Sequence, residues 1–221
     1  MNPARKAAKS APRVNVYVDG FNLYYGALKG TPYKWLDLDA LFRRLLPDYE
    51  LHRIRYFTAR VKPRPDNGDA PKRQNTYLRA LATLPSVAVH FGSFLVSITA
   101  MPLADPPGSG SPLVRVVKTE EKGSDVNLAT YLVIDAIRGD CEVAVVVSND
   151  SDLCEPIRIV NDEIGVPVII FNPHTRTSVE LKKLIAPRPV RKLRKGPLAA
   201  SQFPAKVRVA NGRSITKPAD W

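Results

Sequence analysis

Residues 141–152 read CEVAVVVSNDSD, an almost unbroken apolar run that passes directly into two aspartates separated by one serine. An apolar run without polar alternation is typical of a parallel strand covered on both faces. Asp150 and Asp152 then stand at the carboxyl end of that strand, which is where open α/β sheets bind their ligands. The stretch therefore predicts a parallel sheet and places two carboxylates at its ligand-binding edge.

The segments on either side alternate between the two kinds of secondary structure. Strands are expected at 14–18, 52–61, 87–91 and 166–171, and helices from near Asn22, at 37–46, 71–84, 124–140, 151–163 and 178–184. This alternation predicts an α/β domain with a mainly parallel sheet. Two further strands, at 94–101 and 113–119, flank the loop PLADPPGSGSP and are expected to form an inserted β-hairpin.

The segment 124–140, SDVNLATYLVIDAIRGD, gives the clearest helical pattern. Ser124 is the predicted N-cap and Gly139 marks the expected end. The predicted buried face consists of Val126, Ala129, Val133, Ala136 and Ile137. A right-handed crossover into strand 143–148 would bring the start of this helix, with Asp125, to the edge that carries Asp150.

The net charge of +12 lies in the two ends of the chain. Residues 1–13 form a basic arm without an acid, residues 186–221 form a basic extension with Asp220 alone, and the predicted domain at 14–185 is neutral. Basic flanks bind phosphate backbones without reading sequence, and the alternative is a solubilising surface. The segment 201–221 is expected to lack regular elements and either to order on RNA or to pack through Phe203, Ile215 and Trp221.

Composition argues for a cytoplasmic protein. No apolar run reaches the length of a membrane span, and the N-terminus lacks the apolar centre of a secretory signal. Cys141 and Cys154 are expected to be reduced thiols, because two cysteines make neither a disulfide framework nor a zinc site. The three histidines are scattered along the chain and predict no metal site.

A quartet of aspartates is the candidate site. Asp19 follows strand 14–18, so it meets Asp150, Asp152 and Asp125 if the two strands are neighbours. Crowded carboxylates need a cation, and an all-oxygen donor set suits Mg²⁺ or Mn²⁺. Such an ion is suited to phosphodiester hydrolysis. Taken singly, an aspartate here also has a structural explanation: Asp150 as a helix cap, and Asp125 as a favourable charge at a helix start.

Three other residues complete the predicted site. Asn22 and Ser148 are expected to hold a carboxylate or a phosphate through their polar side chains. Lys122 either contacts the scissile phosphate or stays in solvent.

Three ordered motifs, VYVDGFNLYY (16–25), EKGSDVNLATYLVIDA (121–136) and VVVSNDSDLCEPI (145–157), resemble the NYN domain, a branch of the PIN-like nucleases. The resemblance runs from about Val14 to Phe171 and implies a Rossmann-like three-layer α/β/α fold with Mg²⁺- or Mn²⁺-dependent ribonuclease activity. It also implies catalytic and metal-binding roles for Asp19, Asp125, Asp150 and Asp152, with Asn22 in support. The chain departs from the family at Asn149, where many members have glycine, and at Leu153, where phenylalanine is frequent.

The predicted function is therefore metal-dependent hydrolysis of RNA, with RNA as partner, a homodimer as a further option, and no membrane contact. One alternative is an RNA-binding regulatory module without turnover. Another is a monooxygenase acting on an N-heteroaromatic compound in a catabolic pathway, an activity to which some NYN-like chains have been assigned. A nicotinamide or flavin site has no support, because the chain has no GxGxxG fingerprint and only GSG at 108–110.

Overall fold

The computed structural model describes residues 10–221 except 64–66, 107 and 210–211. Its centre is a six-stranded sheet in the order β3-β2-β1-β6-β7-β8. The strands are β1 (Arg13–Asp19), β2 (Glu50–Thr58), β3 (Val87–Phe91), β6 (Val143–Val147), β7 (Val168–Asn172) and β8 (Arg191–Lys192). Every neighbouring pair in this sheet is parallel, which confirms the predicted α/β class.

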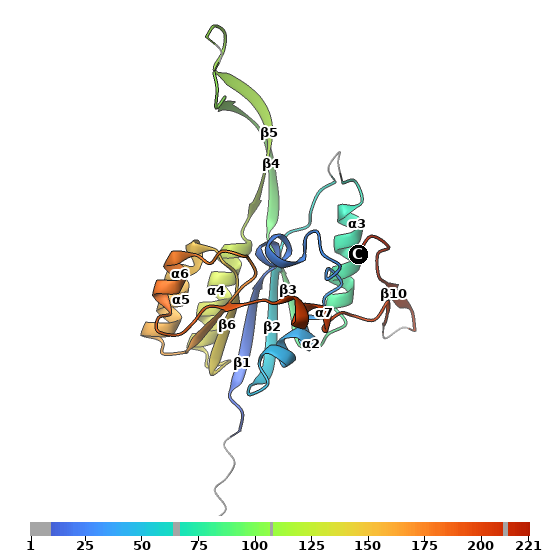
Figure 1. The fold of residues 1–221 in the computed structure, drawn as a ribbon, viewed down its shortest axis with the longest axis vertical. Helices are drawn as coiled ribbons and strands as arrows, with labels where there is room; N and C mark the ends of the chain where they lie inside the picture. The colour runs from blue at the N-terminus through green and yellow to red at the C-terminus, as the bar shows by residue number, and fades with distance from the viewer. Residues whose placement is uncertain (1–9, 64–66, 107, 210–211) are drawn as a thin grey trace, which may run out of the picture.

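Helices cover both faces of the sheet (Figure 1). One face packs against α2 (Leu38–Leu45), α3 (Ala70–Leu81) and α7 (Lys195–Ala199), and the other packs against α4 (Ser124–Ile137), α5 (Cys154–Arg158) and α6 (Val179–Leu184). Successive side chains of β1 alternate between these two cores: Val16 and Val18 enter the first, and Tyr17 enters the second. All five residues of β6 are buried, as expected for a central parallel strand.

Helix α4 buries only part of the predicted face. Ala136 is buried and Ala129 and Val133 pack against the core as predicted, whereas Val126 and Ile137 are 68% and 63% exposed. The buried face also includes Leu128, Leu132 and Asp135, which the prediction left out. Asp135 accepts two hydrogen bonds from the Arg55 guanidinium, at 2.6 and 2.9 Å, and one from the Tyr17 hydroxyl at 3.0 Å. A buried carboxylate is tolerated when it is paired in this way, so the true face contains an acid that a search for apolar residues passes over.

The start of α4 also differs from the prediction. Gly123, at a φ of 92°, is the N-cap, and Ser124 is already helical. The backbone N–H and hydroxyl of Ser124 both donate to the Glu121 carboxylate, which therefore satisfies the helix start from outside. Gly139, at a φ of 64°, ends the helix as predicted.

Strands β4 (Ser93–Pro102) and β5 (Leu113–Lys122) pair antiparallel and confirm the inserted hairpin. The hairpin projects from the body on the side where β1 ends (Figure 1). Its outer part carries exposed apolar side chains, among them Ile98 and Val117, which are 64% and 69% exposed and face each other across the two strands. Its base, by contrast, joins the body of the domain next to the start of α4.

The C-terminal extension packs against the body, which confirms the alternative that it packs through Phe203, Ile215 and Trp221. The expectation that 201–221 lacks regular elements is wrong, because two short strands lie there. The extension contains β8, α7, β9 (Lys206–Arg208) and β10 (Ser214–Thr216). Phe203 and Ile215 are buried, and Trp221 lies with its ring centroid 6.2 Å from that of Trp35. Trp35 donates from Nε1 to the Pro204 carbonyl, and its own carbonyl accepts from the Phe203 N–H at 2.9 Å. The extension is therefore held by apolar burial and by hydrogen bonds to Trp35.

The two cysteines are free thiols. Cys141 is buried and Cys154 is half-buried, and neither forms a disulfide. Most of the predicted N-terminal arm, residues 1–9, lies outside the described residues. Among the helices that the structure describes, none has the length and apolarity needed to span a membrane.

Candidate functional site: an acidic sheet edge beside an aromatic pocket

The candidate site lies where the order of the sheet reverses. From β1 the sheet extends toward one edge through β2 and β3, and from β6 it extends toward the opposite edge through β7 and β8. The crevice between β1 and β6 is therefore a topological switch point. Val18 pairs with Val147, which places Asp19 at the end of β1 beside the loop that follows β6. Strands β1 and β6 are therefore neighbours, as the predicted site requires.

Asp19 is held firmly at this edge. Its side chain is buried, with 5% of the residue exposed. Its Oδ1 accepts from the backbone N–H of Asn22 at 2.9 Å and its Oδ2 accepts from the Ser148 hydroxyl at 3.0 Å. Burial raises the pKa of the Asp19 carboxyl, with a smaller contribution in the same direction from the charge of Asp150, while these two hydrogen bonds oppose the rise.

The loop after β6 is ordered by the same polar residues. The Ser148 hydroxyl accepts from the Asp150 N–H at 3.1 Å, and Asn22 Oδ1 accepts from the Asn149 N–H at 3.0 Å. Asp150 Oδ1 accepts from the Asp152 N–H at 3.0 Å and thus caps the short helical turn Ser151–Leu153. Asn22 and Ser148 therefore position the carboxylates in this structure by joining the ends of β1 and β6.

Asp125 belongs to the same electrostatic cluster. Burial, together with the smaller effect of the charges of Asp19, Asp150, Glu121 and Asp152, raises the pKa of its carboxyl to about 6. The start of a helix lowers the pKa of a carboxyl, so burial and the neighbouring carboxylates outweigh that effect here. The four predicted aspartates thus share one region, and Glu121 is a fifth acid that the sequence pattern did not single out.

The donor set suits a hard divalent cation, although the side chains are not gathered around a single point. Within the described residues, no group of three or more His, Cys, Asp or Glu side chains could hold a metal ion as placed. The donors at the edge are all oxygen atoms, and neighbouring carboxylates add to the effect of burial in raising the pKa of Asp125. Mg²⁺ is commonly held by one or two carboxylates and several waters, so these residues fit such an ion without a complete protein cage.

Lys122 lies at the end of β5, outside the carboxylate cluster. Its side chain is 58% exposed, and its ammonium group lies 3.5 Å from the Glu120 carboxylate. Its predicted contact with a phosphate stays a prediction.

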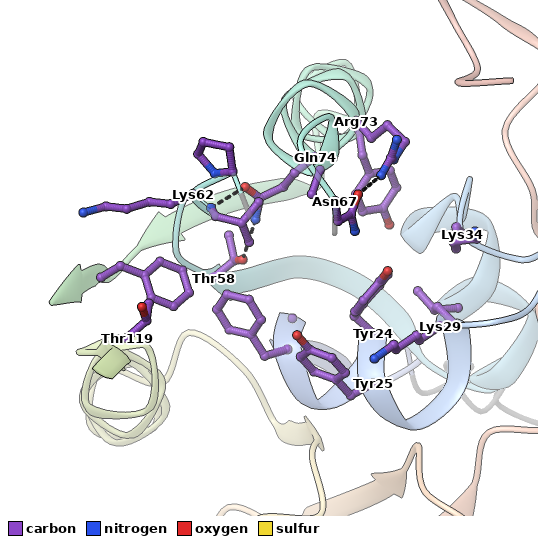
Figure 2. Close-up of a pocket in the computed structure, with 18 of the residues that line it drawn as sticks. Tyr24, Tyr25, Lys29, Lys34, Thr58, Lys62, Asn67, Arg73, Gln74 and Thr119 are labelled. Atoms are coloured by element: carbon purple, nitrogen blue, oxygen red, sulfur yellow. Dashed lines mark hydrogen bonds between the residues drawn. The ribbon is translucent and has the colours of Figure 1, made fainter. Parts of the chain in front are cut away.

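A pocket of about 520 Å³ opens beside the acidic edge, and the sequence pattern gave no sign of it. It begins at Gly20 and Phe21, directly after Asp19, and extends to the loop before α3, α3 itself and the base of the hairpin. Figure 2 shows Tyr24, Tyr25 and Lys29 on one side of it, with Asn67, Arg73 and Gln74 on the other. The aromatic side chains in its lining include Phe21, Tyr24, Tyr25, Tyr77, Phe94 and Trp221.

Basic side chains accompany the aromatic ones. Lys29, Lys34, Lys62 and Arg73 line the pocket, and none of the described lining residues is Asp or Glu. Tyr56 connects the two regions: it lines the pocket, burial raises the pKa of its hydroxyl, and the charge of Asp19 raises it further. An acidic edge and a basic aromatic pocket are therefore adjacent.

Comparison with known proteins gives a family and a fold. The profile of the NYN domain matches residues 13–185. The chain is 34% identical over 246 residues to 6-hydroxy-3-succinoylpyridine 3-monooxygenase HspA of Pseudomonas putida, with 98% of this chain and 78% of the relative covered. A crystal structure of a protein of unknown function from Vibrio parahaemolyticus is similar with a TM-score of 0.51 and 14% identity, over 81% of this chain and 93% of that one, and supports the fold alone.

Proposed function

The chain belongs to the NYN domain family, and from that premise we propose that it is a metal-dependent ribonuclease that hydrolyses RNA phosphodiester bonds at the acidic sheet edge. The observation that carries the proposal is the hydrogen-bonded link of Asp19 and Asp150 through Ser148 at the switch point of the sheet. The charges of Asp19, Asp150 and Asp152 also act on Asp125. The net charge of +12 supports an anionic polymer as substrate.

Three of the aspartates would bind the metal ion in different ways. Asp150 stands at the end of β6 and would bind Mg²⁺ or Mn²⁺ directly, while Asp152, inside the following turn, would act through a water. Asp19 would be a second direct ligand, because Ser148 and Asn22 fix both of its oxygens. An ion held by these residues would supply a water of lowered pKa and would stabilise charge on the phosphate.

Cleavage of a mixed RNA pool by purified protein with Mg²⁺ or Mn²⁺ tests the proposal. Asp150→Asn keeps the shape of the side chain and should abolish cleavage. Asp48→Asn is the matched control, because Asp48 is exposed in the turn before β2 and away from the acidic edge. Cleavage that survives Asp150→Asn or EDTA would refute the mechanism, and RNA that is bound but left intact with every metal would favour a binding module without turnover.

A second candidate is hydroxylation of a small N-heteroaromatic compound. The relative from Pseudomonas putida carries the name of such a monooxygenase, and the pocket has aromatic walls and basic side chains that suit a heteroaromatic acid. Consumption of NADH by the purified protein, dependent on a heteroaromatic carboxylate, would support this candidate. A lack of NADH oxidation, together with no absorbance beyond the protein band, would eliminate it.

A further inference from the structure

We propose that the pocket beside the acidic edge binds the base of one unpaired nucleotide of the substrate RNA. The inference rests on the proposed ribonuclease function and specifies how its substrate is held. A cavity of about 520 Å³ is within the ordinary range for small organic ligands, roughly 300–1,000 Å³.

The position of the pocket links it to the reaction centre. Gly20 and Phe21 line it, and they follow Asp19 without a break. Tyr56 lies between the two regions and contacts the start of α1 (Gly20–Leu23) closely, since a Cβ added at Gly20 would lie 2.7 Å from the Tyr56 hydroxyl. A base seated in the pocket would therefore leave its own phosphate near the carboxylates.

The walls offer stacking surfaces. Tyr24 and Tyr25 meet edge to face with ring centroids 5.3 Å apart, and Phe21 meets Phe94 of the hairpin in the same way at 5.8 Å. Tyr25 is 52% exposed, so its ring is available to a ligand. Aromatic rings stack on any base, because every base has a π-face.

The charges favour an anionic ligand at the rim. The Lys29 ammonium lies 5.0 Å from the Tyr25 ring centroid, and the exposed Lys62 has neither a hydrogen bond nor an ion pair with the rest of the described chain. Lys34 and Arg73 are tied to the tail through the Asp220 carbonyl and carboxylate, at 3.1 and 3.4 Å. Lys29 and Lys62 are therefore the cations that remain for a phosphate.

Two amides line the pocket. Asn67 Oδ1 already accepts from the Arg73 guanidinium, and both polar atoms of Gln74 are committed to the backbone. Gln74 Oε1 accepts from the Val61 N–H at 2.9 Å, and its Nε2 donates to the Ala59 carbonyl at 2.8 Å. It fixes the end of β2 and offers little to a base edge. Binding should therefore depend on stacking, with weak preference among bases, and should require an unpaired base, since a paired base cannot leave its duplex without an unpairing cost.

The test is binding of adenosine and uridine 5′-monophosphates in EDTA, followed through tryptophan fluorescence, which excludes cleavage from the readout. Tyr25→Ala should weaken both by about tenfold, and Lys62→Ala should weaken the nucleotides but not the free nucleosides. Ile137→Ala and Arg44→Ala, at exposed positions on α4 and α2 outside the pocket, are the matched controls. Equal affinities in wild type and Tyr25→Ala, or binding of nicotinate in place of the nucleotides, would overturn the inference.

Cleavage of single-stranded and duplex RNA by the same variants separates this inference from the proposed function. Tyr25→Ala should lower the preference for single strands. If wild type cleaves RNA but Tyr25→Ala changes neither nucleotide affinity nor that preference, the pocket inference fails and the ribonuclease stands. If nucleotides bind as expected but no RNA is cleaved with any metal, the ribonuclease fails and the nucleotide pocket stands.

Discussion

Asp125→Asn should stabilise the metal-free protein above neutral pH. The carboxyl has a pKa of about 6 in the folded protein, against an ordinary value of 3.8. Between these two values the folded state binds more protons than the unfolded state, so its stability falls as pH rises from about 4 to about 6. At about 1.4 kcal/mol per pH unit the full loss is about 3 kcal/mol, and solvent screening of this half-buried side chain reduces it to about 1 kcal/mol.

Urea unfolding in EDTA at pH 4 and pH 8 measures this effect. The asparagine has nearly the same shape but no charge, so Asp125→Asn should be about 1 kcal/mol more stable than wild type at pH 8 and show little gain at pH 4. Asp48→Asn, at an exposed site, should show no such dependence on pH. Asp125→Asn that is equally or less stable than wild type at pH 8 would contradict the claim that burial and neighbouring carboxylates destabilise the ionised form of Asp125.

Two further substitutions test the scaffold of the site. Asp135→Ala should destabilise the fold by about 3–5 kcal/mol in urea unfolding, because it leaves the buried Arg55 guanidinium unpaired. Glu155→Ala, which removes an ion pair with Arg158 whose side chains are 65% and 39% exposed, should cost about 1 kcal/mol or less. Similar losses of stability for the two variants would contradict this. Gly20→Ala should lower the free energy of unfolding by about 1–3 kcal/mol and impair RNA cleavage, because the new Cβ would lie 2.7 Å from both the Phe57 carbonyl and the Tyr56 hydroxyl. Gly196→Ala, with open space around it, is the control. A Gly20→Ala protein with unchanged stability and cleavage would refute the close packing.

The sheet and its acidic edge were predictable because their signals are local. The apolar density of 143–147 requires a covered strand, and a carboxylate directly after such a strand lies at the ligand-binding edge whatever the rest of the chain does. Only the adjacency of β1 and β6 depended on topology, and the right-handed crossover rule limits that choice strongly.

The burial of Asp135 on α4 and the pocket were not predictable, because both depend on distant partners. Asp135 is buried through Arg55, which lies 80 positions away in the sequence. The pocket takes its walls from α1 and the turn after it, from α3, from the hairpin and from Trp221, and no local periodicity encodes such a set. The apolar residues Phe203, Ile215 and Trp221 indicated that the tail packs, but its two strands were missed for a related reason: they are short, and they are held by burial in the cluster that contains Trp35.

The central claim is that the acidic edge between β1 and β6 binds a divalent cation. Calorimetric titration of Mn²⁺ into wild type, Asp150→Asn and Asp48→Asn tests it without any assumption about substrate. Mn²⁺ should bind wild type and Asp48→Asn alike, and at least about tenfold more weakly to Asp150→Asn, which has lost a direct ligand. Equal Mn²⁺ affinity in wild type and Asp150→Asn, or no binding to any of the three, would contradict the claim.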